Sequence, residues 1–152
     1  MKNTLRPLFI FVTFSLVITI ACKKTAATVE IDENYVAENY TKKEVDIVMR
    51  DGVKLHTTIY SPKDTSKEYP ILMQRTPYSS RPYGEGFVKT KIGPNKHLMK
   101  ERNIIVYQDV RGRWMSEGHY DNMRAYIPNK QSDKDVDESS DTYDTIEWLV
   151  NN

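Results

Sequence analysis

Several side chains that could carry out chemistry lie in one short polar stretch of the sequence, from Asp109 to His119. Asp109, Ser116 and His119 are the residue types of a Ser-His-Asp triad, in which the histidine accepts the proton of an attacking serine. A single short loop rarely allows that geometry, and the tight G-x-S-x-G turn that presents such a serine is absent from the sequence. We therefore predict that Asp109, Arg111 and Glu117 fix the loop through hydrogen bonds instead of reacting.

The strands that precede the polar loops must position these side chains. The uninterrupted apolar run that begins at Ile104 predicts a strand over 104–108 that is buried on both faces. Residues 69–74 predict a shorter strand, which leads into a loop at 75–86 that contains two prolines and two glycines. In open parallel sheets, sites are built from the loops that follow the carboxyl ends of strands.

The flanking segments predict a β-hairpin and two helices. Apolar and polar residues alternate over 44–50 and again over 53–59, with Asp51-Gly52 between them as a two-residue turn and His56 as an ordinary strand side chain. Residues 95–102 predict a short helix and 120–134 a long loop. The last segment, 135–152, predicts a helix with Ser139 or Ser140 as its N-cap and an apolar face made of Tyr143, Ile146, Leu149 and Val150.

The charges are unevenly distributed along the chain. Residues 71–130 contain 11 basic and 5 acidic side chains, whereas residues 131–152 contain 1 basic and 7 acidic ones. We interpret the two blocks as solvated surfaces that do not pair with each other. The acids near residue 137 are explained by the partial positive charge of a helix N-terminus, which we favour over a metal site.

The composition suits one globular domain. The chain has 152 residues, of which 39% are hydrophobic and 28% charged, and its formal charge of +1 argues against nucleic acid as a partner. The single cysteine excludes an internal disulfide framework and an all-cysteine metal site. No Walker loop, G-x-G-x-x-G or H-E-x-x-H motif is present.

The N-terminus has the pattern of an export signal. Lys2 and Arg6 precede an uncharged apolar run that is shorter than the about 20 residues of a membrane span, and Ala21 stands directly before Cys22. We predict a lipoprotein-type signal peptide over 1–22 with lipidation of Cys22, so that the mature protein is periplasmic or at the cell surface of a bacterium, held to the membrane by the lipid alone. An ordinary secretory signal or a short anchor is the alternative. Residues 23–43 are then a polar tether.

The order of elements predicts an α/β fold in which an antiparallel hairpin leads into a mostly parallel sheet with flanking helices. Within that order the sequence resembles the cocaine-esterase and X-Pro dipeptidyl-peptidase class of α/β-hydrolases, nearest the α-amino-acid ester hydrolase branch. The segments that carry the resemblance are Arg75-Thr76-Pro77-Tyr78, Tyr107-Gln108-Asp109-Val110-Arg111-Gly112, Ser116-Glu117-Gly118, Ile127-Pro128-Asn129-Lys130, Asp137-Glu138 and Asp141-Thr142-Tyr143-Asp144-Thr145-Ile146-Glu147-Trp148-Leu149.

The resemblance implies a serine hydrolase that needs no cofactor. It implies that residues 44–152 are the N-terminal part of the catalytic domain, truncated before the serine, and that Tyr78 is the oxyanion-hole donor. The implied substrates are α-amino-acid esters or β-lactam side-chain amides. An X-Pro dipeptidyl peptidase acting on short peptides and a non-catalytic lipoprotein with a binding or structural role are the alternatives, and a homo-oligomer is left open. We expect the chain alone to be inactive, and poorly soluble because its last strand has an open edge.

Overall fold

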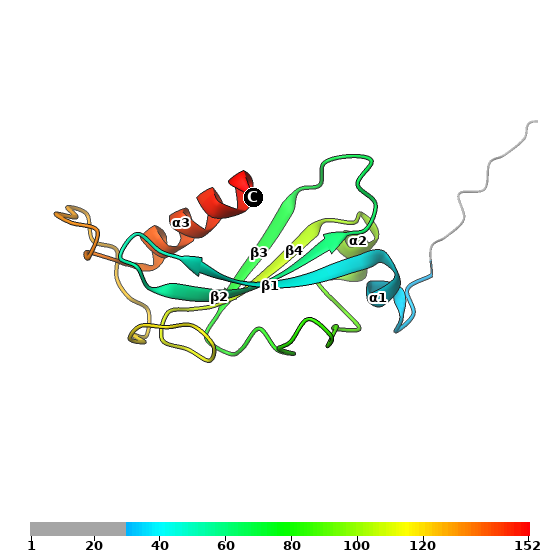
Figure 1. Ribbon diagram of the computed structural model, residues 1–152, viewed down its shortest axis with the longest axis horizontal. Helices are drawn as coiled ribbons and strands as arrows, with labels where there is room; N and C mark the ends of the chain where they lie inside the picture. Colours follow the sequence, from blue (N-terminus) through cyan, green and yellow to red (C-terminus); the bar gives the residue numbers. More distant parts are fainter. Residues whose placement is uncertain (1–29) are drawn as a thin grey trace, which may run out of the picture.

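The computed structural model describes residues 30–152. The predicted signal peptide over 1–22, Cys22 and the start of the tether lie outside the described residues. Within the described part, no helix is long and apolar enough to cross a membrane. The elements, shown in Figure 1, follow the order α1 (Tyr35–Asn39), β1 (Tyr40–Val48), β2 (Lys54–Pro62), β3 (Ile71–Thr76), α2 (Lys96–Lys100), β4 (Ile104–Asp109) and α3 (Glu138–Asn151).

The strands form one mixed sheet in the order β1-β2-β4-β3. β1 and β2 are antiparallel, β2 and β4 are antiparallel, and β3 and β4 are parallel. An antiparallel hairpin therefore leads into a parallel pair, which confirms the predicted α/β fold class. β4 lies between β2 and β3, and β1 and β3 are the edge strands of the sheet within residues 30–152. The prediction that the last strand has the open edge was wrong, because the chain crosses from β3 over α2 and returns to the inner position.

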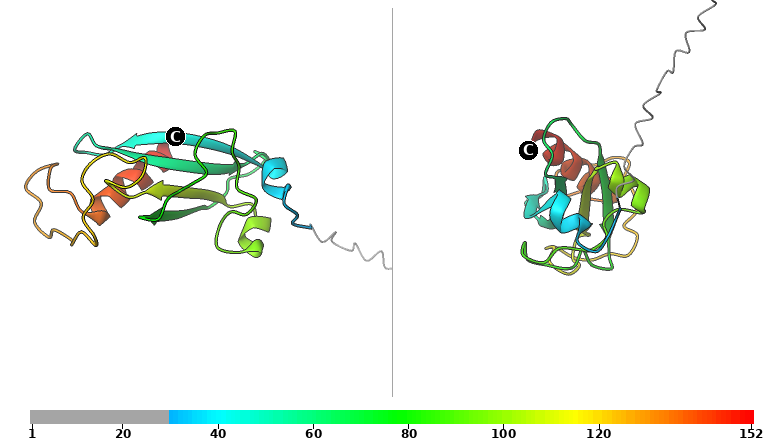
Figure 2. Two further views of the ribbon diagram at one scale, coloured as in Figure 1. Left: turned by 90° about the horizontal axis from the view of Figure 1, so that it is seen from below. Right: turned by 90° about the vertical axis from the view of Figure 1, so that its right-hand side faces the viewer.

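Apolar side chains pack on both faces of the sheet, and α2 and α3 cover opposite faces (Figure 2). On the α2 side, tyrosines dominate a cluster of Tyr35, Val36, Tyr40, Tyr60, Ile92, Met99, Ile105 and Tyr107. On the α3 side, a smaller cluster of Ile47, Met49 and Leu55 packs with Trp148 of the helix. This arrangement follows from the period of β2, because Leu55 and Tyr60 differ in parity along the strand and so point to opposite faces.

The predicted tether ends earlier than residue 43. Tyr35 and Val36 of α1 and Tyr40 at the start of β1 are buried in the α2-side cluster. Residues 35–43 are therefore part of the packed domain. Three apolar residues among many polar ones are too few to produce a visible period, so the sequence did not reveal this segment.

The hairpin turn has three residues instead of the predicted two. The Met49 N–H donates to the Val53 carbonyl at 2.8 Å, which encloses Arg50, Asp51 and Gly52. Only Gly52 has a positive φ, +87°. This is a turn followed by a left-handed glycine, which is the common form of a three-residue loop.

Helix α3 lies on the sheet through a polar surface. Thr145, Asp141 and Ser140 are its buried residues, whereas Tyr143 and Ile146 of the predicted apolar face are exposed. The cause is the buried side chain of Gln108 in β4, whose amide donates to Thr57 Oγ1 at 3.0 Å and to Thr145 Oγ1 at 2.9 Å. Because the sheet presents a hydrogen-bonding group here, the helix turns its hydroxyl groups inward.

Asp137 is the N-cap of α3, and the prediction of Ser139 or Ser140 was wrong. Its carboxylate accepts from the Ser140 N–H at 2.8 Å, and the Ser140 hydroxyl accepts from the Asp137 N–H at 2.9 Å, which completes a capping box. Burial acts to raise the pKa of Asp137, but hydrogen bonds from the Ile127 N–H, the Lys130 ammonium and the Ser140 N–H outweigh it. The pKa of Asp137 is well below its usual value.

This pKa makes the helix cap sensitive to acid. A depressed carboxyl pKa contributes stability above the unfolded-state value of about 3.9, and that stability is lost as the pH falls through the folded-state pKa. We expect the melting temperature to decrease as the pH is lowered below about 5, and to decrease less steeply in Asp137→Asn. The asparagine still caps the helix but carries no charge that could be protonated. Parallel pH profiles of wild type and variant in thermal unfolding would contradict this assignment.

Candidate active site

The loops after β3 and β4 lie side by side at the carboxyl end of the parallel pair (Figure 1, green and yellow segments). Thr76 and Asp109 are register partners, and the Val110 N–H donates to the Thr76 carbonyl at 3.2 Å. Tyr78 follows two residues later, and its side chain is 85% exposed. The ring therefore projects from the edge of the sheet where sites are built in this class of fold.

The peptide that carries Tyr78 is held on both sides. Its own N–H donates to Thr76 Oγ1 at 3.0 Å, and the preceding carbonyl of Pro77 accepts from Trp114 Nε1 at 2.9 Å and from Arg113 Nε at 3.1 Å. Arg113 and Trp114 belong to the loop after β4, so this loop fixes the backbone of Tyr78. The Tyr78 hydroxyl makes no hydrogen bond within residues 30–152.

Asp109, the last residue of β4, forms hydrogen bonds with the loop after β3. Its carboxylate is fully buried and accepts from the Ser80 N–H at 2.7 Å and from the Tyr83 hydroxyl at 2.8 Å. Burial, together with the hydrogen bond to Asp109, raises the pKa of Tyr83, so the phenol is a donor at neutral pH. The same hydroxyl lies 3.1 Å from Ser79 Oγ. Asp109 thus holds the turn that immediately follows Tyr78.

A buried lysine of β1 anchors the far part of the same loop. The Lys42 ammonium donates to the carbonyls of Pro82, Gly84 and Phe87 at 2.6, 2.8 and 3.0 Å, and it pairs with Glu44 at 2.6 Å. The side chain of Lys42 is only 1% exposed. Three carbonyls and a carboxylate satisfy this buried cation, which would otherwise be costly.

Ser116 is a structural residue. Its hydroxyl donates to the Asp109 carbonyl at 2.6 Å and accepts from the His56 N–H at 2.8 Å, and it is buried. His119, its only histidine neighbour in the loop sequence, is exposed. The side chain of His56 lies 3.0 Å from Asp46 on the adjacent strand. These contacts show Ser116 and His56 as side chains that hold the loop after β4 and the neighbouring strands together.

Arg111 connects the loop after β4 with the hairpin turn and with α3. Its guanidinium donates in two pairs of hydrogen bonds, to Asp51 at 2.7 and 3.1 Å and to Asp141 at 3.0 and 2.6 Å. Burial alone would lower the pKa of Arg111, but the two carboxylates raise it further above its already high value. Glu117 accepts from the Lys54 N–H at 3.0 Å and ties the loop to β2. The predicted loop-fixing role of Asp109, Arg111 and Glu117 is confirmed.

The basic and acidic blocks of the sequence pair with each other, so their interpretation as separate solvated surfaces was wrong. The acids at the start of α3 each have a different main partner, and three of these partners belong to the basic block. The ion pairs are Lys130–Asp137 at 2.5 Å, Arg75–Glu138 at 2.7 Å, Arg111–Asp141 at 2.6 Å and Arg50–Asp144 at 2.6 Å. No group of acids, histidines or cysteines in residues 30–152 is arranged to hold a metal ion.

Asp109→Asn tests the role assigned to this buried carboxylate. The amide is nearly the same size, but only one of its two groups can accept, so either the Ser80 N–H or the Tyr83 hydroxyl loses its acceptor. Hydrogen bonds to charged groups contribute about 1.5–3 kcal/mol, and we expect a loss of stability in that range. Hydrogen exchange of the Ser80 amide should become faster if the amide oxygen of the asparagine turns toward Tyr83, whereas Asp121→Asn in the exposed loop should change neither this exchange nor the stability. Wild-type stability of Asp109→Asn together with unchanged protection at Ser80 would remove Asp109 from this role.

The mixed sheet, the crossover helix and the loops gathered at the carboxyl edge of the parallel pair place the chain in the α/β-hydrolase class of folds. The sequence profile of the X-Pro dipeptidyl-peptidase (S15) family matches residues 51–152, about two thirds of the chain. The chain belongs to this family, which is a family of hydrolases. Among curated proteins, none gives a significant match.

Solved structures agree with the family. An α-amino acid ester hydrolase is 34% identical with a TM-score of 0.63, and the match covers 88% of this chain and 22% of that one. An aminopeptidase from a marine sediment Thaumarchaeota archaeon is 36% identical with a TM-score of 0.63, over 85% of this chain and 21% of that one. A CocE/NonD family hydrolase from Staphylococcus aureus matches at 21% identity with a TM-score of 0.42, over 74% and 20% of the two chains. The chain therefore spans about a fifth of the length of these proteins.

Proposed function

We propose that this chain supplies part of the active site of an exported serine hydrolase, with Tyr78 as a donor of the oxyanion hole. The observation that supports the proposal is the geometry of Tyr78, an exposed phenol on a backbone segment fixed by Thr76, Arg113 and Trp114. A preorganised donor of this kind stabilises charge that develops on the carbonyl oxygen during acyl transfer. The serine, aspartate and histidine of the triad are proposed to come from sequence that follows residue 152.

In the proposed reaction, the serine oxygen bonds to the substrate carbonyl carbon while a histidine takes its proton. The carbonyl oxygen becomes negative and accepts a hydrogen bond from Tyr78. The tetrahedral intermediate then expels the alcohol or amine, which receives the proton from the histidine, and water hydrolyses the acyl-enzyme by the same steps. The part played by this chain is the fixed donor.

For the substrate, we propose esters or amides of α-amino acids, including β-lactam side-chain amides. The two solved structures that are more than 30% identical are named as an α-amino acid ester hydrolase and an aminopeptidase. Both names describe substrates with a free α-amino group next to the carbonyl that is attacked. An X-Pro dipeptidyl peptidase is the second candidate, since the matching family profile has that description.

The test uses the product of the complete reading frame that encodes this chain. A fluorophosphonate probe, which reacts with activated serines, should label the product and abolish hydrolysis of L-alanine 4-nitrophenyl ester. The 152-residue chain alone should show neither labelling nor turnover. Faster cleavage of Ala-Pro-4-nitroanilide than of Ala-4-nitroanilide would select the dipeptidyl peptidase. A folded full-length product without labelling would refute the enzyme and favour the non-catalytic lipoprotein.

We further propose that the protein is exported and lipidated at Cys22. The support is the sequence pattern alone: a basic start, an uncharged apolar run and Ala21 before the only cysteine. Cells grown with labelled palmitate should incorporate the label into the wild-type protein and not into Cys22→Ser. Incorporation into Cys22→Ser at the wild-type level would contradict the anchor.

A further inference from the structure

We infer that Arg81 and Arg113, which both lie against the indole of Trp114, form a binding site for a carboxylate on the substrate. The inference rests on the proposed function, because it assigns a specificity to the same site. Arg81 belongs to the loop after β3, and Arg113 and Trp114 belong to the loop after β4. Arg113 and Trp114 both donate a hydrogen bond to the Pro77 carbonyl, which is part of the peptide bond to Tyr78. A ligand bound here would therefore lie beside the proposed oxyanion donor.

Both arginines lie over aromatic rings at cation–π distances. The guanidinium carbon of Arg81 lies 4.7 Å from the centroid of the Trp114 ring, and that of Arg113 lies 5.8 Å from the same ring. Arg113 is also 4.8 Å from the ring of Tyr120. A guanidinium over an aromatic ring can still donate from its N–H edges, and the terminal N–H groups of Arg81 and Arg113 match the two oxygens of a carboxylate.

Neither arginine has an acidic partner in the part of the chain that the structure describes. The other arginines that are close to the sheet have one: Arg50, Arg75, Arg102 and Arg111 all pair with carboxylates. Within residues 30–152, the guanidinium of Arg113 makes a single hydrogen bond, from Nε to the Pro77 carbonyl, and the guanidinium of Arg81 makes none. Both positive charges lie beside the same ring, so an anion near that ring is attracted to both.

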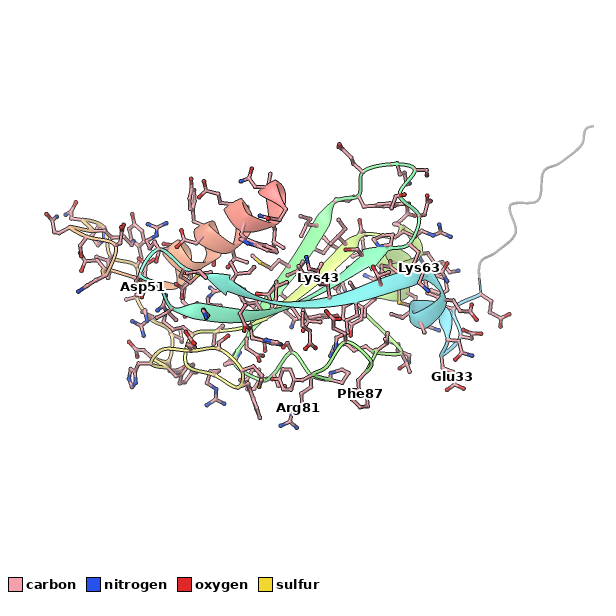
Figure 3. The ribbon with its side chains drawn as sticks, in the orientation of Figure 1. Glu33, Lys43, Asp51, Lys63, Arg81 and Phe87 are labelled. Carbon is pink, nitrogen blue, oxygen red and sulfur yellow. The ribbon has the colours of Figure 1, made fainter. Side chains whose placement is uncertain are left out.

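The surface around the two cations is exposed and partly apolar. Trp114 is 48% exposed, and Met115 and Tyr78 next to it are also exposed. Figure 3 shows Arg81 projecting away from the ribbon at this edge of the molecule. Two guanidiniums beside exposed aromatic and apolar side chains fit a carboxylate that is attached to a planar or apolar group. With an α-amino acid on the acyl side, that carboxylate belongs to the leaving group, as in a dipeptide.

The test compares two L-alanine esters in the product of the complete reading frame, one of 4-hydroxybenzoate and one of methyl 4-hydroxybenzoate. They differ in whether the leaving group carries a free carboxylate. In Arg81→Gln, kcat/KM for the first ester should decrease about tenfold relative to the second, since the lost hydrogen bonds are to a charged group. Arg81→Glu should enlarge the effect, and raising the ionic strength should reduce it in the wild type. Arg124→Gln, at an arginine that does not contact Trp114, is the control.

A binding measurement separates this inference from the proposed function. In calorimetric titrations, benzoate should bind the wild type more tightly than benzamide, and Arg81→Gln should abolish the difference. Preferential binding of benzoate without any ester hydrolysis would support the carboxylate site and refute the hydrolase. Hydrolysis of both esters with an unchanged ratio in Arg81→Gln and Arg81→Glu would overturn the carboxylate site and leave the hydrolase intact.

Discussion

Tyr78→Phe in the full-length protein is expected to lower kcat about 10²–10³-fold, because one donor of the oxyanion hole is removed. The hydroxyl has no hydrogen bond within residues 30–152, and the ring is exposed, so the substitution removes no contact of the folded protein. KM should change little, since the donor acts mainly on the charge that develops in the transition state. Burst kinetics with an activated ester report the acylation step directly.

The matched control is Tyr126→Phe, at another exposed loop tyrosine away from the parallel edge. It should keep wild-type kcat, and both variants should have wild-type melting temperatures. Wild-type turnover by Tyr78→Phe, with Tyr126→Phe equally active, would show that Tyr78 is not the donor. A loss of activity that accompanies a lower melting temperature would instead place Tyr78 among the structural residues.

Arg111→Met is expected to destabilise the protein by about 3–5 kcal/mol, because removing one partner of a buried ion pair leaves its charges unpaired. Asp141 has a side chain that is 1% exposed, and Asp51 is 12% exposed, so water cannot fully replace the guanidinium. Both carboxylates would then be held close together without the cation that now separates them. Denaturant unfolding measures the loss as a shift of the midpoint.

The control for Arg111 is Arg102→Met, which removes the same side chain from an ion pair with Asp64. Those two side chains are 37% and 35% exposed, and solvent-exposed pairs of this kind contribute little to stability. The two variants have the same change of charge and size, so the difference between them reports the burial of Arg111 and its second carboxylate partner. Equal unfolding midpoints of Arg111→Met and Arg102→Met would mean that the hydrogen bonds of Arg111 do not stabilise the protein more than an exposed ion pair does.

The strands could be predicted because their signal is local. The alternation over β1 and β2 and the apolar run of β4 each lie within one element, and these strands form as expected. The contact surface of α3 could not be predicted in this way. Its buried residues are polar and are selected by Gln108, which belongs to another element. The spacing of apolar residues along α3, taken by itself, therefore selected a face that the structure leaves largely exposed.

The site was predicted in part for the same reason. Asp109 and Arg111 were recognisable as loop-fixing residues from their types and their place after a strand. Their partners were not, because Ser80 and Tyr83 come from the other loop and Asp51 and Asp141 from distant elements. The pairing of the basic block with the acidic block could not be predicted either, because it depends on which segments the fold brings together. Composition records how many charges a segment has and contains no information on which segments meet.

The two carboxylate partners of Arg111 also determine the order in which this edge of the molecule can be completed. One partner, in the hairpin turn, is synthesised well before the arginine, and the other, in α3, well after it. Because chains emerge N-terminus first at about 5–20 residues per second, the loop after β4 exists for some seconds with only part of its network. Its final conformation is available only after α3 has docked. Docking of α3 is thus the step that completes the ion-pair network of this loop.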